Sequence, residues 1–272
     1  MKQITIKYAV LMGCLVAMFS AAQHIQAQNM VTFIPPDKSK MPPPEQMDTI
    51  ITVIDAAKNY RRITILDHNI VVRDGYMMGD KKTGRWTEYT DTGVMLQLAD
   101  YENDVKSGDY MEFDVNGSLE VLEHYKNGLL DGEQKRFVQG QKGRILKSAY
   151  SYKEGLLHGT CSEYTSDGKL QSQSTYVMGK KSGPASWYFS NGNLALTQMY
   201  EQDQLNGTQS VFNQEGILIS QGTYKNNLRE GTWTEYYDSG KMKTTGKYTQ
   251  DKKTGTWTYY DESGAVTKTE KL

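Results

Sequence analysis

Hydrophobic and polar residues alternate in short runs along most of this chain. In residues 232–237, β-branched and aromatic residues alternate with polar ones, and Asp238, Ser239 and Gly240 follow as a tight-turn signal. Residues 241–249 form a second run of this kind, and residues 250–254 turn the chain again. The pattern predicts two short strands and two turns, with no room for a helix between them.

This pattern of two strands and two turns recurs at a fixed spacing. Each copy starts with a glycine, and every step is 24 residues except the one from Gly132 to Gly159, which is 27. The starting glycines are Gly84, Gly108, Gly132, Gly159, Gly183, Gly207, Gly231 and Gly255. A period of this size indicates an array of small structural units. We therefore predict an all-β protein, an elongated single-layer antiparallel sheet of about eight consecutive β-hairpins over residues 76–272.

Two aromatic columns keep the period and are interpreted as stacking residues of the core. The first lies five residues after each glycine: Tyr89, Phe113, Phe137, Tyr164, Tyr188, Phe212, Tyr236 and Tyr260. The second lies seven residues before the later glycines: Tyr101, Tyr125, Tyr152, Tyr176, Tyr200, Tyr224 and Tyr248. Residues 49–54 and 63–72 are β-branched runs, and we expect residues 48–75 to form capping strands before the first unit.

The position two residues after each glycine varies between units. It holds Trp86, Tyr110, Gln134, Cys161, Ala185, Gln209, Trp233 and Trp257. Strand alternation places it on the opposite face from the aromatic at plus five, unless a bulge intervenes. The face that carries an aromatic at plus five in every unit is therefore the predicted core. Trp86, Tyr110, Trp233 and Trp257 mark a candidate binding face. The alternative is that these side chains are extra packing.

The third unit differs from the others because residues 137–143 carry three extra residues. They form either a longer surface loop or a functional insertion. Units that read Tyr-x-x-Gly-x-x-x-Gly-x-Trp-x-x-Tyr-x-x-x-Gly, such as residues 248–264, resemble MORN repeats in their bacterial variant form. The resemblance implies consecutive hairpins in a twisted single-layer sheet. It also implies a scaffold or a module that contacts proteins or lipids, and bacterial members are often grouped as YwqK-like antitoxins.

The first 27 residues have the order of a secretory signal peptide. Lys2 and Lys7 precede an apolar run over residues 8–22, and small residues follow. The alternatives are an uncleaved membrane anchor and lipidation at Cys14. Apart from such an anchor, we expect membrane association only if Cys14 is lipidated. Residues 28–47 hold five of the chain's six prolines and read as a linker. We expect an exported protein of the periplasm or cell surface, or else an outer-membrane lipoprotein.

Little in the composition indicates chemistry. The net charge is −1 and charges of both signs are interspersed, so nucleic-acid binding is not expected. The histidines fall at different phases of the repeat, and no pattern indicates a cofactor, a metal or a catalytic residue. We predict a non-enzyme whose elongated surface binds a protein or a cell-envelope component. The alternatives are an antitoxin-like protein that neutralises a partner by binding, and a module that binds cell-wall glycans.

Overall fold

The structure of the protein is a computed structural model that describes residues 47–140 and 143–272. The predicted signal peptide, and the predicted linker up to residue 46, lie outside these residues. Residues 48–272 form one compact unit. Within the described residues, no helix has the length and apolar character that a membrane span requires.

The unit is a single sheet of 21 antiparallel strands. The strands are β1 (Asp48–Asp55), β2 (Tyr60–Asp67), β3 (Ile70–Met78), β4 (Lys81–Tyr89), β5 (Met95–Glu102), β6 (Val105–Phe113), β7 (Leu119–Lys126), β8 (Leu129–Leu130), β9 (Gly132–Gly140), β10 (Gly143–Lys153), β11 (Leu156–Tyr164), β12 (Leu170–Val177), β13 (Lys180–Tyr188), β14 (Leu194–Glu201), β15 (Gln204–Leu205), β16 (Gly207–Phe212), β17 (Leu218–Lys225), β18 (Leu228–Tyr236), β19 (Met242–Thr249), β20 (Lys252–Tyr260) and β21 (Val266–Lys271).

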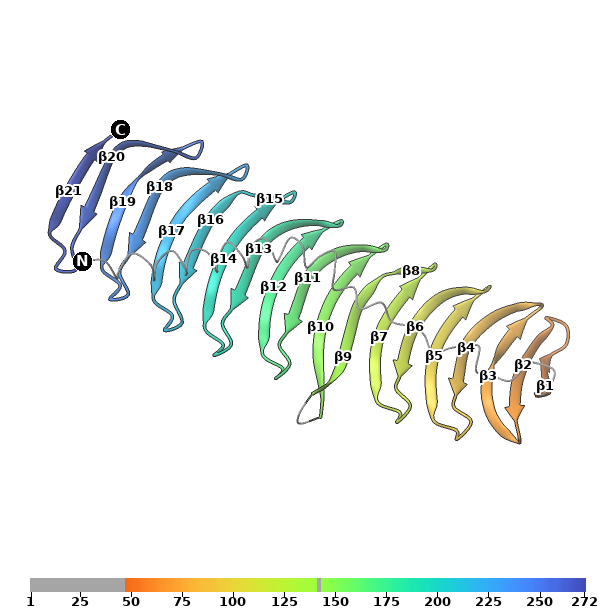
Figure 1. Cartoon of the computed structure of the whole chain (residues 1–272). Helices are drawn as coiled ribbons and strands as arrows, with labels where there is room; N and C mark the ends of the chain where they lie inside the picture. The colour runs from red at the N-terminus through yellow and green to blue at the C-terminus, as the bar shows by residue number, and fades with distance from the viewer. Residues whose placement is uncertain (1–46, 141–142) are drawn as a thin grey trace. The chain divides into compact units, whose positions relative to one another are not determined.

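The strands pair in chain order, from β1 with β2 to β20 with β21. The short strands β8 and β15 pair only with β7 and β14, which also pair with β9 and β16. Figure 1 shows the strands side by side in chain order, with no second layer of secondary structure over them. The predicted all-β array of consecutive hairpins is confirmed. Every contact that holds two units together is therefore local in sequence, as in other repeat proteins.

Two kinds of turn alternate along the sheet. Most turns along the lower edge in Figure 1 span four residues, and in the turn between β4 and β5 the Gly93 N–H donates to the Thr90 carbonyl oxygen at 3.0 Å. From β3 onward the turns along the upper edge have two residues, as at Asn103 and Asp104, which have positive φ angles of 52° and 69°. This is the turn whose twist matches that of the flanking strands.

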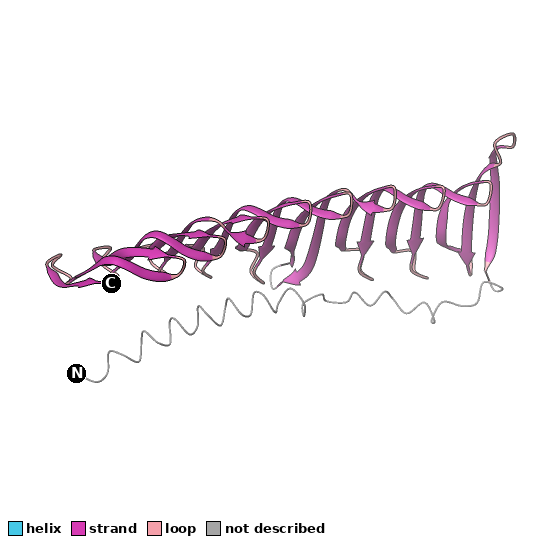
Figure 2. Cartoon of the chain, turned by 90° about the horizontal axis from the view of Figure 1, so that it is seen from above, coloured by secondary structure: helices cyan, strands magenta, loops and turns pink. Residues whose placement is uncertain are grey.

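The repeat glycines bend the strands. All eight have φ between +62° and +128°, a region that side chains with a Cβ rarely adopt. The pairing register shifts beside them, as between Ser174 and Tyr176 opposite Gly183. At Gly132 and Gly207 the bend interrupts the strand, which leaves β8 and β15 as two-residue pieces. Figure 2 shows the resulting curvature repeated from hairpin to hairpin.

Two details differ from the expectations. The predicted strand over residues 63–72 is wrong, because His68 and Asn69 adopt positive φ angles and turn the chain from β2 into β3. The three extra residues of the third unit lengthen a hairpin, since Leu146 pairs with Phe137 and Ile145 with Val138. Arg144 fixes this hairpin to the preceding unit by donating to Asp114 at 2.8 Å.

Replacing a repeat glycine tests the bend. Gly207 has φ +127°, and a Cβ there would lie 2.8 Å from Cβ of Met199. We expect Gly207→Ala to lower the free energy of unfolding by about 1–3 kcal/mol through backbone strain and this clash. Urea unfolding followed by circular dichroism measures the change. Thr208→Ala, at the exposed neighbouring position, is the control, and equal stability of the two variants would contradict the proposed role of the glycine.

Candidate binding surface

One row of side chains crosses the whole array on a single face of the sheet. It contains the residues two positions after each repeat glycine and their partners on the neighbouring strands, and we call it the buried row. Its members are Gly75, Trp86, Ala99, Tyr110, Glu123, Gln134, Tyr150, Cys161, Ser174, Ala185, Gln198, Gln209, Gly222, Trp233, Gly246 and Trp257. Most of them are buried.

Large and small residues match across neighbouring strands of the buried row. The indole of Trp233 lies over Gly222, where a Cβ would come within 2.1 Å of the ring. Trp86 over Gly75 and Trp257 over Gly246 repeat this arrangement. In each case the indole N–H donates to a backbone carbonyl of the preceding strand, at 2.8 to 3.2 Å. The flat ring replaces the second layer that this sheet lacks.

The middle of the buried row is polar. Gln134 donates to the buried Glu123 carboxylate at 2.6 Å, and Gln209 accepts from Gln198 at 2.6 Å. Cys161 lies opposite Tyr150, so the large residue of this pair stands on the earlier strand. Buried polar groups are tolerated when they are hydrogen-bonded, as these are.

A column of cations lines the aromatic members of the buried row. Lys106 Nζ lies 3.5 Å from the ring centroid of Tyr110, and Lys253 Nζ lies 4.0 Å from that of Trp257. Lys82, Lys181 and Arg229 make similar contacts with rings of their units. The same position holds leucine in the three units whose plus-two residue is Gln134, Cys161 or Gln209. Burial lowers the pKa of both Lys106 and Lys181.

The upstream tyrosines complete this face. Tyr248 packs edge-to-face between Trp233 and Trp257, with ring centroids 5.9 and 5.1 Å away. Tyr224 adds a further edge-to-face contact with Trp233. Such pairs contribute about 0.5–1.5 kcal/mol each beyond their buried area. The interpretation of this column as part of the core agrees with these contacts.

The predicted assignment of the other two columns to faces is wrong. Trp86, Tyr110, Trp233 and Trp257 are buried, so the plus-two column is the core rather than the face opposite it. A binding role for these four residues stays a prediction, and their burial argues against it. The aromatics at plus five, Tyr89, Phe113, Phe137, Tyr164, Tyr188, Phe212, Tyr236 and Tyr260, are half-buried. Each stands where the strand register shifts, and all except Phe137 lie at the entry to a turn.

Sequence reasoning missed the partners of the plus-two residues. The signal was present, because Gly75, Ala99, Gly222 and Gly246 all stand eleven residues before a plus-two aromatic. A small residue at this fixed distance before a large ring indicates that the ring covers it.

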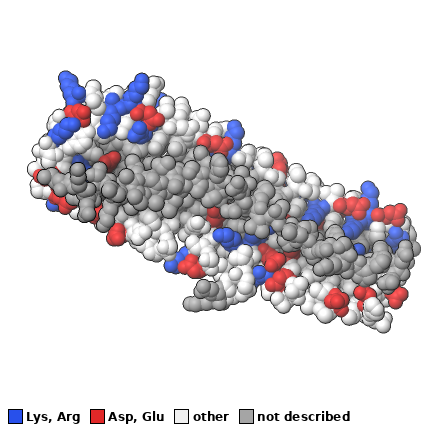
Figure 3. Space-filling model, viewed as in Figure 1, with Lys and Arg blue, Asp and Glu red and all other residues white. Residues whose placement is uncertain are grey.

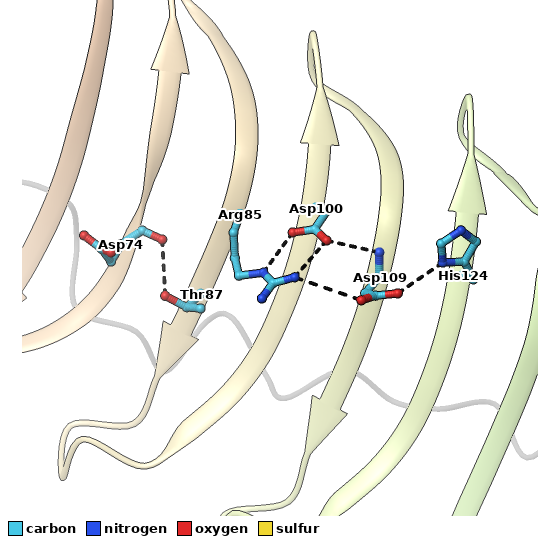
Figure 4. Close-up of polar contacts among 6 residues, drawn as sticks. All are labelled: Asp74, Arg85, Thr87, Asp100, Asp109 and His124. Carbon is cyan, nitrogen blue, oxygen red and sulfur yellow. Dashed lines mark hydrogen bonds and ion pairs between the residues drawn. The ribbon is translucent and has the colours of Figure 1, made fainter. Parts of the chain in front are cut away.

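The opposite face, which we call the open face, carries a ladder of polar contacts in the first units (Figure 4). Arg85 donates to Asp100 at 3.0 Å, and the Asp109 N–H donates to the same carboxylate at 3.2 Å. The Asp109 side chain lies 3.1 Å from His124 Nδ1. Thr87 donates to the Asp74 backbone carbonyl at 3.3 Å. These groups satisfy one another across neighbouring strands and form no isolated reactive pair.

Apolar side chains gather on the open face beside the two-residue turns of the central units. We call Val105, Leu129, Leu156 and Val177 the central ridge. Each is close to half exposed, and Leu129 is 51% exposed. Val105, Leu129 and Leu156 lie against the turn glycines of the next unit, at the positions of Gly128, Gly155 and Gly179. Lysines alternate with three of them, since Lys126 pairs with Leu129, Lys153 with Leu156 and Lys180 with Val177, whereas Val105 pairs with Glu102.

The charged residues show no other concentration that would define a site. On the face seen in Figure 3, lysine and arginine lie close to aspartate and glutamate along both long edges. No group of His, Cys, Asp and Glu side chains in the described part of the chain could hold a metal ion. The central ridge is therefore the surface feature that we consider further.

The fold and its repeating core define a β-hairpin repeat protein. The family model described as the MORN repeat variant matches residues 157–178, 181–202, 205–226 and 229–250. These four consecutive units thus match the MORN repeat variant, and the units before and after them share their period and hairpin structure. No curated protein matches the chain.

We predict that the protein loses stability in alkali, because tyrosines on the face of the buried row have raised pKa values. Burial raises the pKa of Tyr200 to about 12, whereas an unfolded tyrosine ionises near pH 10. Between these values only the unfolded state loses the proton, so unfolding becomes more favourable as the pH rises. We expect the urea midpoint to fall between about pH 10 and pH 12, and to fall less steeply in Tyr200→Phe. The same variant at pH 8 gives the baseline, and equal slopes would contradict the prediction.

Proposed function

We propose that this protein is a non-enzymatic exported repeat protein whose elongated surface binds another protein. MORN repeats support a binding or scaffold role as a class. The observation that carries the proposal is the central ridge, a series of exposed apolar side chains beside neighbouring turns on the open face. Aligned exposed apolar groups of this kind mark interaction sites more often than scattered ones do.

The chemistry of the central ridge suggests the kind of partner. Leu129 and Leu156 stand about two strands apart, roughly 10 Å, with Lys153 between them. A complementary surface would present apolar side chains with carboxylates between them. The partner that fits is thus a protein with an extended apolar and acidic surface, and the lysines would guide its approach.

The location of the protein is part of this proposal. The charged, apolar and small residues of positions 1–27 support export to the periplasm or cell surface. Cell fractionation checks this part, and recovery of the protein with the cytoplasm would contradict it. An antitoxin-like role has no supporting feature on the described surface. Glycan binding through exposed indoles finds no support either, since three of the four Trp rings belong to the buried row.

Site-specific photocrosslinking in the producing cells tests the binding role. A photoreactive residue at Leu129 should capture one defined partner protein, because this side chain protrudes from the central ridge. The matched control is Val115, which is 71% exposed in a turn at the other long edge of the sheet. Purified partner should then bind at least about tenfold more weakly to Leu129→Asp/Leu156→Asp, as expected for an apolar contact replaced by charge.

Two outcomes would contradict the proposal. One is crosslinking at Val115 to the same proteins and with the same yield as at Leu129. The other is unchanged affinity of the double variant for the captured partner while circular dichroism shows an intact sheet.

A further inference from the structure

The two ends of the sheet are built differently. Within the described residues, the last strand at each end has a neighbour on one side only, which leaves its outer backbone N–H and C=O groups available for pairing. At the C-terminal end, β21 pairs with β20, has six residues and carries Lys268, Glu270 and Lys271. At the N-terminal end, β1 pairs with β2 and has eight residues, and its central residues carry no charged side chain.

The centre of β1 is apolar on both faces. Ile50, Ile51, Val53 and Ile54 are each at least half exposed, and Val53 reaches 63%. Ile51 lies opposite Ile63, which is opposite Gly75, so Ile51 continues the buried row beyond its first glycine. It is nevertheless 57% exposed, because no strand of the described part of the chain lies beyond β1. The buried row therefore ends at an uncovered apolar residue.

The sequence of this strand is nearly the same in both directions. Around Thr52 the order is Ile50, Ile51, Thr52, Val53, Ile54, so each apolar residue has an apolar counterpart at the same distance. A two-fold axis perpendicular to the sheet, midway between the Thr52 residues of two copies, would place Ile51 of one copy opposite Val53 of the other. It would also keep the face of the buried row on the same side in both copies. A two-fold interface requires this kind of self-complementarity.

We propose that β1 pairs antiparallel with β1 of a second copy of this chain, with Thr52 opposite Thr52, to form a dimer with one continuous sheet. The buried row then runs on from Ile51 into Val53 of the second copy. Pairing β1 with β21 of another copy would instead place lysines beside the apolar centre and would generate an open chain of molecules. The two-fold arrangement closes after two copies and covers the apolar strand. This dimer is separate from binding at the central ridge and does not depend on it.

Disulfide formation at the axis tests the register. In the full chain with Cys14→Ser and Cys161→Ser, we expect Thr52→Cys to form a covalent dimer under mild oxidation. Directly opposite residues in antiparallel strands bring their Cβ atoms to about 4.5–5.5 Å, close to disulfide range. Thr269→Cys, at an exposed position of β21, is the matched control and should remain largely uncrosslinked. Equal crosslinking at the two positions, or none at Thr52→Cys, overturns the proposal.

The molecular mass in solution tests the interface itself. Sedimentation equilibrium of the full chain at micromolar concentration should give twice the mass of one chain. Ile51→Lys/Val53→Lys should give a single-chain mass with an unchanged circular dichroism spectrum, whereas Val266→Lys at the other edge should leave the mass doubled. A monomeric parent protein overturns the proposal, including the case in which the chain's own N-terminal segment covers β1. A doubled mass for Ile51→Lys/Val53→Lys would also overturn the proposal.

Discussion

The structure depends on the fit between each ring of the buried row and the small residue beneath it. A single-layer sheet has no second layer to cover its core, so the core must be made by side chains that lie flat on the neighbouring strand. Trp233 over Gly222 is the simplest case, because any Cβ at residue 222 would overlap the indole. Between the aromatic ends of the row, hydrogen-bonded pairs such as Gln198 and Gln209 take over the same task.

The repeat glycines make this fit possible. Their positive φ angles bend each strand just before the plus-two residue and set that residue against the preceding strand. Lysine or arginine then lies beside the aromatic rings, while leucine takes this position in the units of Gln134, Cys161 and Gln209. Since each of these contacts joins neighbouring strands, a unit can vary its core pair without disturbing distant units. The open face is left to carry interactions with other molecules.

The period, the turns and the hairpin topology could be predicted because they depend on local signals, namely glycine and short β-forming runs. Alternation could not identify the core face. It places the plus-two and plus-five positions on opposite faces of a strand but does not show which face is buried. The uniform aromatic character of the plus-five position did not indicate burial. The aromatics at plus five, such as Tyr236, recur because each strand meets a bulge there, whereas plus-two residues vary with their partners eleven positions earlier. The central ridge consists of single apolar residues that are far apart in the sequence and become neighbours only in the folded sheet.

A double-mutant cycle at Gly222 and Trp233 tests the central claim most directly, because the chain already contains the alternative pair Ala99 and Tyr110. Gly222→Ala alone should be strongly destabilising, and Trp233→Tyr alone should lose part of the ring contact. The account predicts that the double variant is more stable than Gly222→Ala alone, with a coupling free energy of about 0.5–3 kcal/mol in urea unfolding. Additive effects, with the double variant the least stable of the three, would contradict it.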